Sequence, residues 1–179
     1  MSIRACIASV LATSALAAPV AALAAGTVTM TPPATGAFSV TLDGTDKTGT
    51  YSLAIPVSYT STANNKNATL GWHITATSTT FKGTTTLRTL STTASTITSF
   101  SDSAGCTLAN CTNPTNSIGY PLTIPAAAVA PAPITTFLAT APSGAGGNTV
   151  TMQVSVAVPA NTFADVYTST LTLAVIEGP

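Results

Sequence analysis

Apolar and polar residues alternate along most of the chain after residue 24. The stretch "TYSLAIPVSYT" (50–60) has an apolar side chain at every second position, and "TVTMQVSVAVP" (149–159) and "YTSTLTLAV" (167–175) repeat the pattern. Because successive side chains of a strand point to opposite faces, each stretch is predicted to be a strand with one apolar face and one Thr/Ser face. The predicted core residues are Tyr51, Leu53, Ile55, Val57, Tyr59, Val150, Met152, Val154, Val156, Val158, Tyr167, Leu171, Leu173 and Val175.

Shorter segments of the same kind fill the rest of the chain, separated by turn-forming runs such as "DGTDKTG" (43–49) and "PSGAGGN" (142–148). They cover residues 27–30, 37–42, 70–78, 84–90, 95–100, 118–124 and 134–140. This organisation predicts an all-β fold: a two-sheet antiparallel β-sandwich of the Ig-like or Greek-key type, with about eight to ten strands. Pro56 and Pro121 lie inside two of these strands, so both strands are expected at sheet edges or at bulges. The proline-rich run 125–133 is predicted to be an extended connector rather than a helix.

The first 24 residues follow a different pattern. Arg4 is the only charged residue before Asp43, an Ala-rich apolar run follows it, and small residues close the run at Ala22 and Ala24. This order predicts a secretory signal peptide (1–24) that is cleaved after Ala24, followed by a single β-sandwich domain (25–179). A membrane anchor is the alternative, but Pro19 and the many alanines make the run weakly hydrophobic for a spanning helix. We therefore expect a secreted or cell-surface protein with no membrane insertion after the signal is removed.

Charge is scarce. Charged residues form 6% of the chain and the formal net charge is zero, whereas about 25% is typical of soluble domains. The few Lys and Arg residues are scattered, so the sequence has no basic footprint for nucleic acid. The polar surface is expected to consist of Thr, Ser and Asn, which lack the mutual repulsion that keeps proteins monomeric. This composition favours a wall, matrix or assembly component over a freely diffusing enzyme.

Two cysteines of the expected mature chain, Cys106 and Cys111, lie in a long polar loop (101–117). In an exported protein, cysteines this close are expected to form a local disulfide. The alternative is a metal site, but two thiolates without a nearby histidine make a poor zinc set. A ring this small mainly holds the shape of the loop.

Catalytic chemistry is hard to assemble from these residues. His73 is the only histidine, and it follows Trp72 on a predicted strand, so we expect it to point to solvent when the indole is buried. Asp43 and Asp46 offer carboxylates for calcium, but an Asp-Gly hairpin turn needs the same residues and is favoured. The sequence therefore predicts no catalytic residues, no metal site, no cofactor and no enzymatic activity.

Two segments far apart in the chain together resemble a known family. "GWHITATSTTF" (71–81) and "VPANTFADVYTSTLTLAVIEGP" (158–179) are similar to the two motifs of the WxL domain family of Gram-positive surface proteins, particularly its divergent secreted forms in high-GC bacteria. The family pairs an early W-x-L element with a late strand of the form Y-x-x-x-L-T-W-x-L. The matching positions, as core or ligand-contact residues, are Trp72, Ile74, Tyr167, Leu171 and Leu173, the last standing where the family has its second tryptophan.

The resemblance implies non-covalent attachment to the cell wall through peptidoglycan, or to partner surface proteins. The expected function is that of a secreted, non-enzymatic cell-envelope protein of the WxL type. The alternative is a structural subunit of a pilus or spore-coat-like fibre that self-assembles by strand addition, with "AGTVTMTPPATG" (25–36) as the donor segment. On either interpretation the C-terminal strand is expected to be an integral core element, while loss of residues 177–179 alone is expected to matter little.

Overall fold

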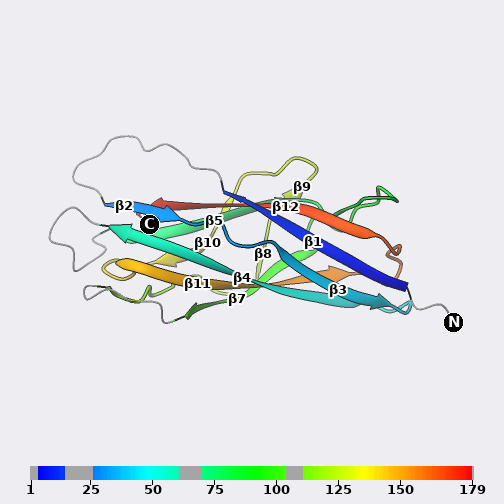
Figure 1. Cartoon of the computed structure of the whole chain (residues 1–179), viewed down its shortest axis with the longest axis horizontal. Helices are drawn as coiled ribbons and strands as arrows, with labels where there is room; N and C mark the ends of the chain where they lie inside the picture. The colour runs from blue at the N-terminus through cyan, green and yellow to red at the C-terminus, as the bar shows by residue number, and fades with distance from the viewer. Residues whose placement is uncertain (1–3, 15–25, 61–69, 104–110, 179) are drawn as a thin grey trace.

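The computed structural model describes residues 4–14, 26–60, 70–103 and 111–178, with side chains described from residue 26 onward. These residues form twelve strands and no helix, arranged in two sheets that face one another (Figure 1). The predicted all-β, two-sheet sandwich is confirmed, and nine of the twelve strands have four residues or more. Its assignment to the Ig-like or Greek-key type stays a prediction.

One sheet, called sheet B, is antiparallel throughout. In spatial order its strands are β2 (Thr27–Met30), β4 (Lys47–Thr60), β11 (Gly146–Val158), β7 (Ser95–Ser103) and β8 (Leu122–Thr123). The long strands β4 and β11 pair along thirteen successive residues and form its centre.

The second sheet, called sheet A, is mostly antiparallel. Its main path runs through β10 (Ile134–Ala139), β5 (Trp72–Thr79), β12 (Val166–Glu177), β1 (Arg4–Ser14) and β3 (Gly36–Leu42). The two-residue strands β6 (Lys82–Gly83) and β9 (Ala126–Ala127) pair with β12 and β5. The pairs β1–β12 and β5–β9 are parallel. In Figure 1, β1 crosses the visible face between β12 and β3.

The core lies between the sheets and follows the predicted alternation. On β4 and β11 every second residue is buried, and β12 buries Tyr167, Leu171 and Leu173 in the same way, whereas Val175 is only partly buried. Ser169 also lies on the inner face of β12, where its hydroxyl donates to the carbonyl of Thr79. A buried hydroxyl with such a partner avoids the cost of an unsatisfied polar group.

Two predicted strands differ from the structure. Residues 84–90 form a turn and an irregular segment rather than a strand, because the N–H groups of Thr85 and Thr86 bind the Asp165 carboxylate instead of a neighbouring strand. Residues 118–124 contain only the short β8, because the Asn116 side chain takes the N–H of Ile118 and Pro121 has none to donate.

The edge prediction for the two proline-containing strands holds for one of them. Pro121 directly precedes β8 at the edge of sheet B. Pro56 lies on the interior strand β4, which accommodates it because β2 pairs only with residues 57–60. Residues 125–133 form an extended connector, as expected, and it lies along the outer face of β5. There Thr77 donates its hydroxyl to the carbonyl of Pro131, with 2.8 Å between the oxygens.

The predicted donor segment is partly used within its own chain. Residues 27–30 form β2, which pairs with β4 from Thr27–Thr60 to Met30–Val57. The N–H of Thr31 then donates to the Pro56 carbonyl at 3.0 Å. The alternating Val28 and Met30 of β2 pack against this chain's own core, and donation of residues 25–36 to another molecule stays a prediction.

Candidate functional site

The two segments that carry the family resemblance lie on paired strands of sheet A. β5 and β12 are antiparallel neighbours, with Trp72 opposite Glu177 and Ile74 opposite Val175. The five family positions are all buried, with exposed fractions of 1% or less: Trp72, Ile74, Tyr167, Leu171 and Leu173. A ligand therefore cannot reach these side chains without opening the sandwich.

Trp72 is the centre of an aromatic and polar cluster at one end of the fold. Its indole stacks on Phe137 with 5.2 Å between ring centroids, and its Nε1 donates to the Gly144 carbonyl at 2.9 Å. Leu70, inside the predicted strand 70–78, lies before the start of β5 and is 48% exposed. The indole is thus fully buried with its one donor satisfied, as buried tryptophans require.

The loop before β11 is shaped around this indole. Gly144 has a φ of +82°, and a Cβ at this position would lie 2.5 Å from the Trp72 Nε1. Asn148 then closes the loop, since its Nδ2 donates to the carbonyls of Gly144 and Ala145 at 3.2 Å each. Residues 142–148 ("PSGAGGN"), which the sequence identifies only as a turn, therefore fix the position of the buried Trp72 ring.

Glu177 ties together three segments near the C-terminal end of β12. Its Oε1 accepts from the Gly26 N–H and from the Tyr59 hydroxyl, both at 2.7 Å. These groups lie at the start of β2 and near the end of β4, so the carboxylate bridges sheet A and sheet B. The next residue adds two contacts, because the N–H of Gly178 donates to Gly71 and its carbonyl lies 2.7 Å from His73 Nδ1. The expectation that residues 177–179 matter little is not supported by these contacts; no local sequence signal identifies Glu177 as an inter-sheet tie.

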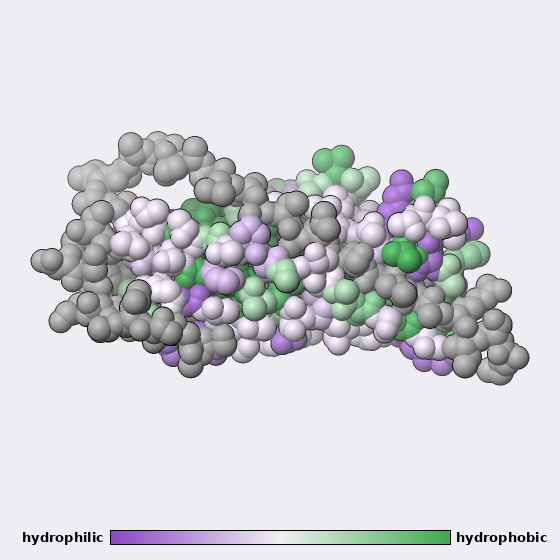
Figure 2. Space-filling view, in the orientation of Figure 1, coloured by the Kyte–Doolittle hydropathy of each residue, from purple (hydrophilic) through white to green (hydrophobic). Residues whose placement is uncertain are grey.

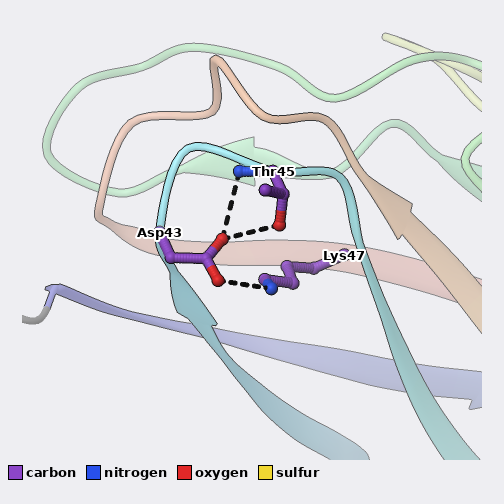
Figure 3. A network of polar contacts seen from close by, with 3 residues as sticks. All are labelled: Asp43, Thr45 and Lys47. Atoms are coloured by element: carbon purple, nitrogen blue, oxygen red, sulfur yellow. Dashed lines mark hydrogen bonds and ion pairs between the residues drawn. The ribbon is translucent and has the colours of Figure 1, made fainter.

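The Asp-Gly turn at residues 43–46 joins β3 to β4. Asp43 accepts from the Thr45 N–H at 3.1 Å and from its hydroxyl at 2.7 Å, and forms an ion pair with Lys47 at 2.7 Å (Figure 3). The hydrogen bond from Lys47 is the largest cause that holds the pKa of Asp43 below its usual range, followed by those from Thr45. Asp46 binds elsewhere, since its Oδ1 accepts from the Ala160 N–H at 2.7 Å. The two carboxylates thus serve as turn and loop tethers, as the turn interpretation predicts.

Asp165 organises the irregular segment 84–86. Its carboxylate accepts from the N–H and the hydroxyl of Thr86 at 2.6 and 2.7 Å, from the Thr85 N–H, and from the Val166 N–H at 2.7 Å. The backbone hydrogen bond from Thr86 is the first of several that hold the pKa of Asp165 below its usual range. Several donors on one carboxylate favour its charged form.

Two further titratable side chains, His73 and Asp102, lie on different sheets. His73, expected in solvent, is instead half-buried, beside the Gly178 carbonyl. Asp102 lies on β7 in sheet B, where partial burial raises its pKa. No group of three or more His, Cys, Asp or Glu side chains gathers within the part of the chain that the structure describes.

The cysteine prediction can be placed only in part. Cys111 is the first described residue after residue 103, and its sulfur lies 3.6 Å from the Gly147 carbonyl oxygen. Cys106 lies outside the described residues, so the Cys106–Cys111 disulfide stays a prediction.

The outer surface carries little charge. Figure 2 shows mostly pale residues of intermediate hydropathy among those described on this face, with few strongly hydrophilic ones. A shallow, open hollow borders β12 on the outer side of sheet A; its walls include Thr79, Lys82, Leu87, Thr168 and Thr170. A second hollow lies beside it, where the Arg88 guanidinium covers the Phe163 ring at 4.0 Å. Both are lined mainly by hydroxyl and apolar groups, with one cationic side chain in each, Lys82 and Arg88.

Comparison with family models, with curated proteins and with solved structures finds no match to this chain. Among the described residues, no helix has the length and apolar character to cross a membrane.

Proposed function

We propose that the chain is a secreted, non-enzymatic cell-envelope protein of the WxL type, held non-covalently by peptidoglycan or by partner surface proteins. The observation that carries the proposal is the pairing of β5 with β12. This pairing brings the Trp72 segment and the Tyr167 segment side by side in one core, although nearly a hundred residues separate them in the sequence. These are the two segments on which the family resemblance rests.

The polar groups support a structural rather than a catalytic role. Asp43, Asp46, Asp165 and Glu177 each accept backbone or side-chain hydrogen bonds that fix a turn or join two segments. The uncharged Thr/Ser surface suits attachment to a neutral polymer or to another such surface, because little charge has to be desolvated on contact.

Fractionation of the native host tests the proposal. We expect the protein in the wall fraction, with residues 1–24 absent from its intact mass and Ala25 at its N-terminus, within two residues. Because so few charges are available to be screened, concentrated salt should release little of the protein, whereas urea should release it without wall-digesting enzymes. A matched measurement uses purified walls and the wild-type protein beside the Asp43→Asn variant, which alters the exposed turn between β3 and β4 but no residue of β5 or β12, and should bind equally. Protein found only in the medium, with no affinity for purified walls, contradicts the proposal.

A second candidate function is a subunit of a fibre that assembles by strand addition. One observation favours it: the middle of sheet A is occupied by β1, which belongs to the segment predicted to be removed. Denaturant-resistant polymers of the processed protein would support this candidate over the first.

A further inference from the structure

β1 occupies a place inside sheet A rather than at its edge. It pairs in parallel with β12 over eight residues, from Ile7–Val166 to Ser14–Leu173. It pairs antiparallel with β3 over seven, from Arg4–Leu42 to Val10–Gly36. Strands β12 and β3 are therefore joined through β1 (Figure 1). We call the space that β1 takes between them the strand seat.

The same residues belong to the predicted signal peptide. Cleavage after Ala24 removes β1 and leaves β12 and β3 on either side of the strand seat, each with backbone N–H and C=O groups that had been paired. Such groups are costly to leave unpaired in a partly apolar environment and readily accept a strand from another chain. The processed sandwich thus has a break in sheet A, whereas every strand of sheet B follows residue 25.

We propose that, in the processed protein, the strand seat binds an extended, uncharged segment of a partner protein, which runs parallel to β12 and antiparallel to β3. This inference rests on the proposed function, because export is what removes residues 1–24. It deepens that function by assigning the surface through which the protein joins its neighbours at the cell envelope.

The walls of the strand seat define the chemistry of the segment. No charged residue occurs on β3 or on β12 between Val166 and Leu173, so a charge on the inner face of the seat would lose its hydration without a partner. On the inner face, β12 presents Tyr167 and β3 presents Phe38, both buried. The β1 residue in register with both of them is Ala8. By register alone, a small residue is therefore expected at this position of the segment.

The register of β1 with its two neighbours limits side-chain size at the following positions as well. Val10 is opposite Ser169 and Gly36, and Ala12 is opposite Leu171. The segment that fits has about eight residues, the length of the β1–β12 register. It has small or short aliphatic residues at alternate positions and no proline in its centre. Main-chain pairing supplies affinity in such strand additions, and the alternate side chains supply specificity.

The occupant is another protein rather than a second copy of this chain. Within the described part of the mature chain every strand keeps a ladder partner except β3, which forms one wall of the seat, and β2, which lies nearest the new N-terminus, pairs with β4. The Gly26 N–H is in addition fixed by Glu177. Donation of β2 to another molecule would break these contacts to form a shorter ladder than the seat offers, since β2 has four residues.

The test uses processed protein from the host wall fraction, purified in urea and refolded, with a synthetic peptide of residues 4–14 that carries Cys6→Ser. We expect saturable binding and a rise of about 5–10 °C in the unfolding midpoint at a peptide concentration near 100 times Kd. A peptide with Val10→Pro should not bind, because Val10 pairs on both sides of the seat. A scrambled peptide of the same composition is the matched control.

Spin labels on the peptide test its direction. A nitroxide at the peptide's N-terminus should broaden the amide signals of Val166 and Thr41, and one at its C-terminus should broaden those of Thr172 and Leu173. The reverse pattern overturns the parallel arrangement. Absence of binding, together with direct amide contacts between β3 and β12, overturns the strand seat itself. Polymers formed by the processed protein alone show that a second copy is the occupant and overturn the assignment to a partner protein.

The proposed function fails by separate measurements. An intact mass that includes Met1 shows that the leader stays, which refutes both the export proposal and the open strand seat. Correct processing and wall retention without peptide binding refute only the strand seat.

Discussion

Sheets A and B arise from similar alternating sequences but use their outer faces differently. On β4 of sheet B, inward residues are buried and outward residues are exposed from Thr50 to Thr60. On β5 of sheet A, residues of both faces are buried, including Thr75 and Thr77. The connector 125–133 pairs with the edge of β5 through β9 and reaches its outer face at Thr77, whose hydroxyl donates to the Pro131 carbonyl. The comparison shows that a Thr-rich face is not necessarily a solvent face: a threonine is readily buried where a backbone carbonyl is available to its hydroxyl.

The two sheets also differ in how they depend on the N-terminal segment. Sheet B consists entirely of strands after residue 25, whereas sheet A includes β1. Variants in sheet A therefore probe a sheet that loss of residues 1–24 would change, whereas variants in sheet B probe one that it would leave intact.

Removal of residues 167–179 should abolish cooperative folding. It deletes most of β12, which pairs with β5 on one side and β1 on the other and buries three large side chains. At about 1.5–3 kcal/mol for each fully buried large apolar side chain, their burial rivals the 5–15 kcal/mol net stability of a typical domain. Circular dichroism and urea unfolding measure the effect. The control in sheet B is Val28→Ala on the edge strand β2, which should leave a cooperative transition. A truncated chain that still unfolds cooperatively contradicts the central place of β12.

Trp72→Ala should lower the free energy of unfolding by about 3–5 kcal/mol, because it leaves a cavity beside Phe137 and removes the donor to Gly144. Met152→Ala in sheet B, also fully buried, should cost about 2–5 kcal/mol through the cavity alone. Trp72→Phe retains an aromatic ring against Phe137 and should cost less than Trp72→Ala. Urea unfolding measures all three. A red-shifted, readily quenched tryptophan emission in the native protein would show instead that the indole is exposed.

Glu177→Gln should cost about 1–3 kcal/mol, because the amide keeps an acceptor but loses the charge that strengthens the bonds from Gly26 and Tyr59. Tyr59→Phe removes the hydroxyl that donates to the Glu177 carboxylate. A double-mutant cycle of the two changes isolates the coupling between the sheets. Strictly additive effects would show that the Tyr59–Glu177 contact contributes nothing to stability.

Acidification should weaken the hydrogen bonds that the carboxylates of Asp43 and Asp165 accept. Asp43 and Asp165 have pKa values held below their ordinary 3.8 in the folded protein, so their contributions are present above about pH 4 and are lost as the pH falls through the lower folded values. Asp43→Asn and Asp165→Asn should therefore each flatten the loss of stability between about pH 4 and pH 2. Urea midpoints over this range measure the change, and an unaltered slope in both variants contradicts the tether role.

Replacement of both Cys106 and Cys111 by Ser should have the smallest effect, because the expected ring is short and removes little chain entropy from the unfolded state. The unfolding midpoint should shift little and the fold should persist. A free-thiol assay that labels both residues in the native secreted protein would refute the disulfide.

The sequence alone was enough to predict the fold class, most of the strands and the core positions on β4, β11 and β12. A period of two depends only on which face of a strand meets the core, and that is a local property of the chain. The same local logic predicted the Asp43 turn and the extended proline-rich connector, since both follow from backbone preferences of a few residues.

Only the tertiary structure decided which distant groups meet. Residues 84–90 have the alternating pattern of a strand. The Asp165 carboxylate accepts hydrogen bonds from the N–H groups of Thr85 and Thr86, however, and the segment forms a turn. Glu177 joins the two sheets and Gly144 accepts from Trp72 because sheet pairing brings these residues together, not because of any residue nearby in sequence. The place of residues 4–14 inside sheet A is equally non-local, since an apolar leader and an apolar strand are alike in composition, and only the register with β12 and β3 distinguishes them.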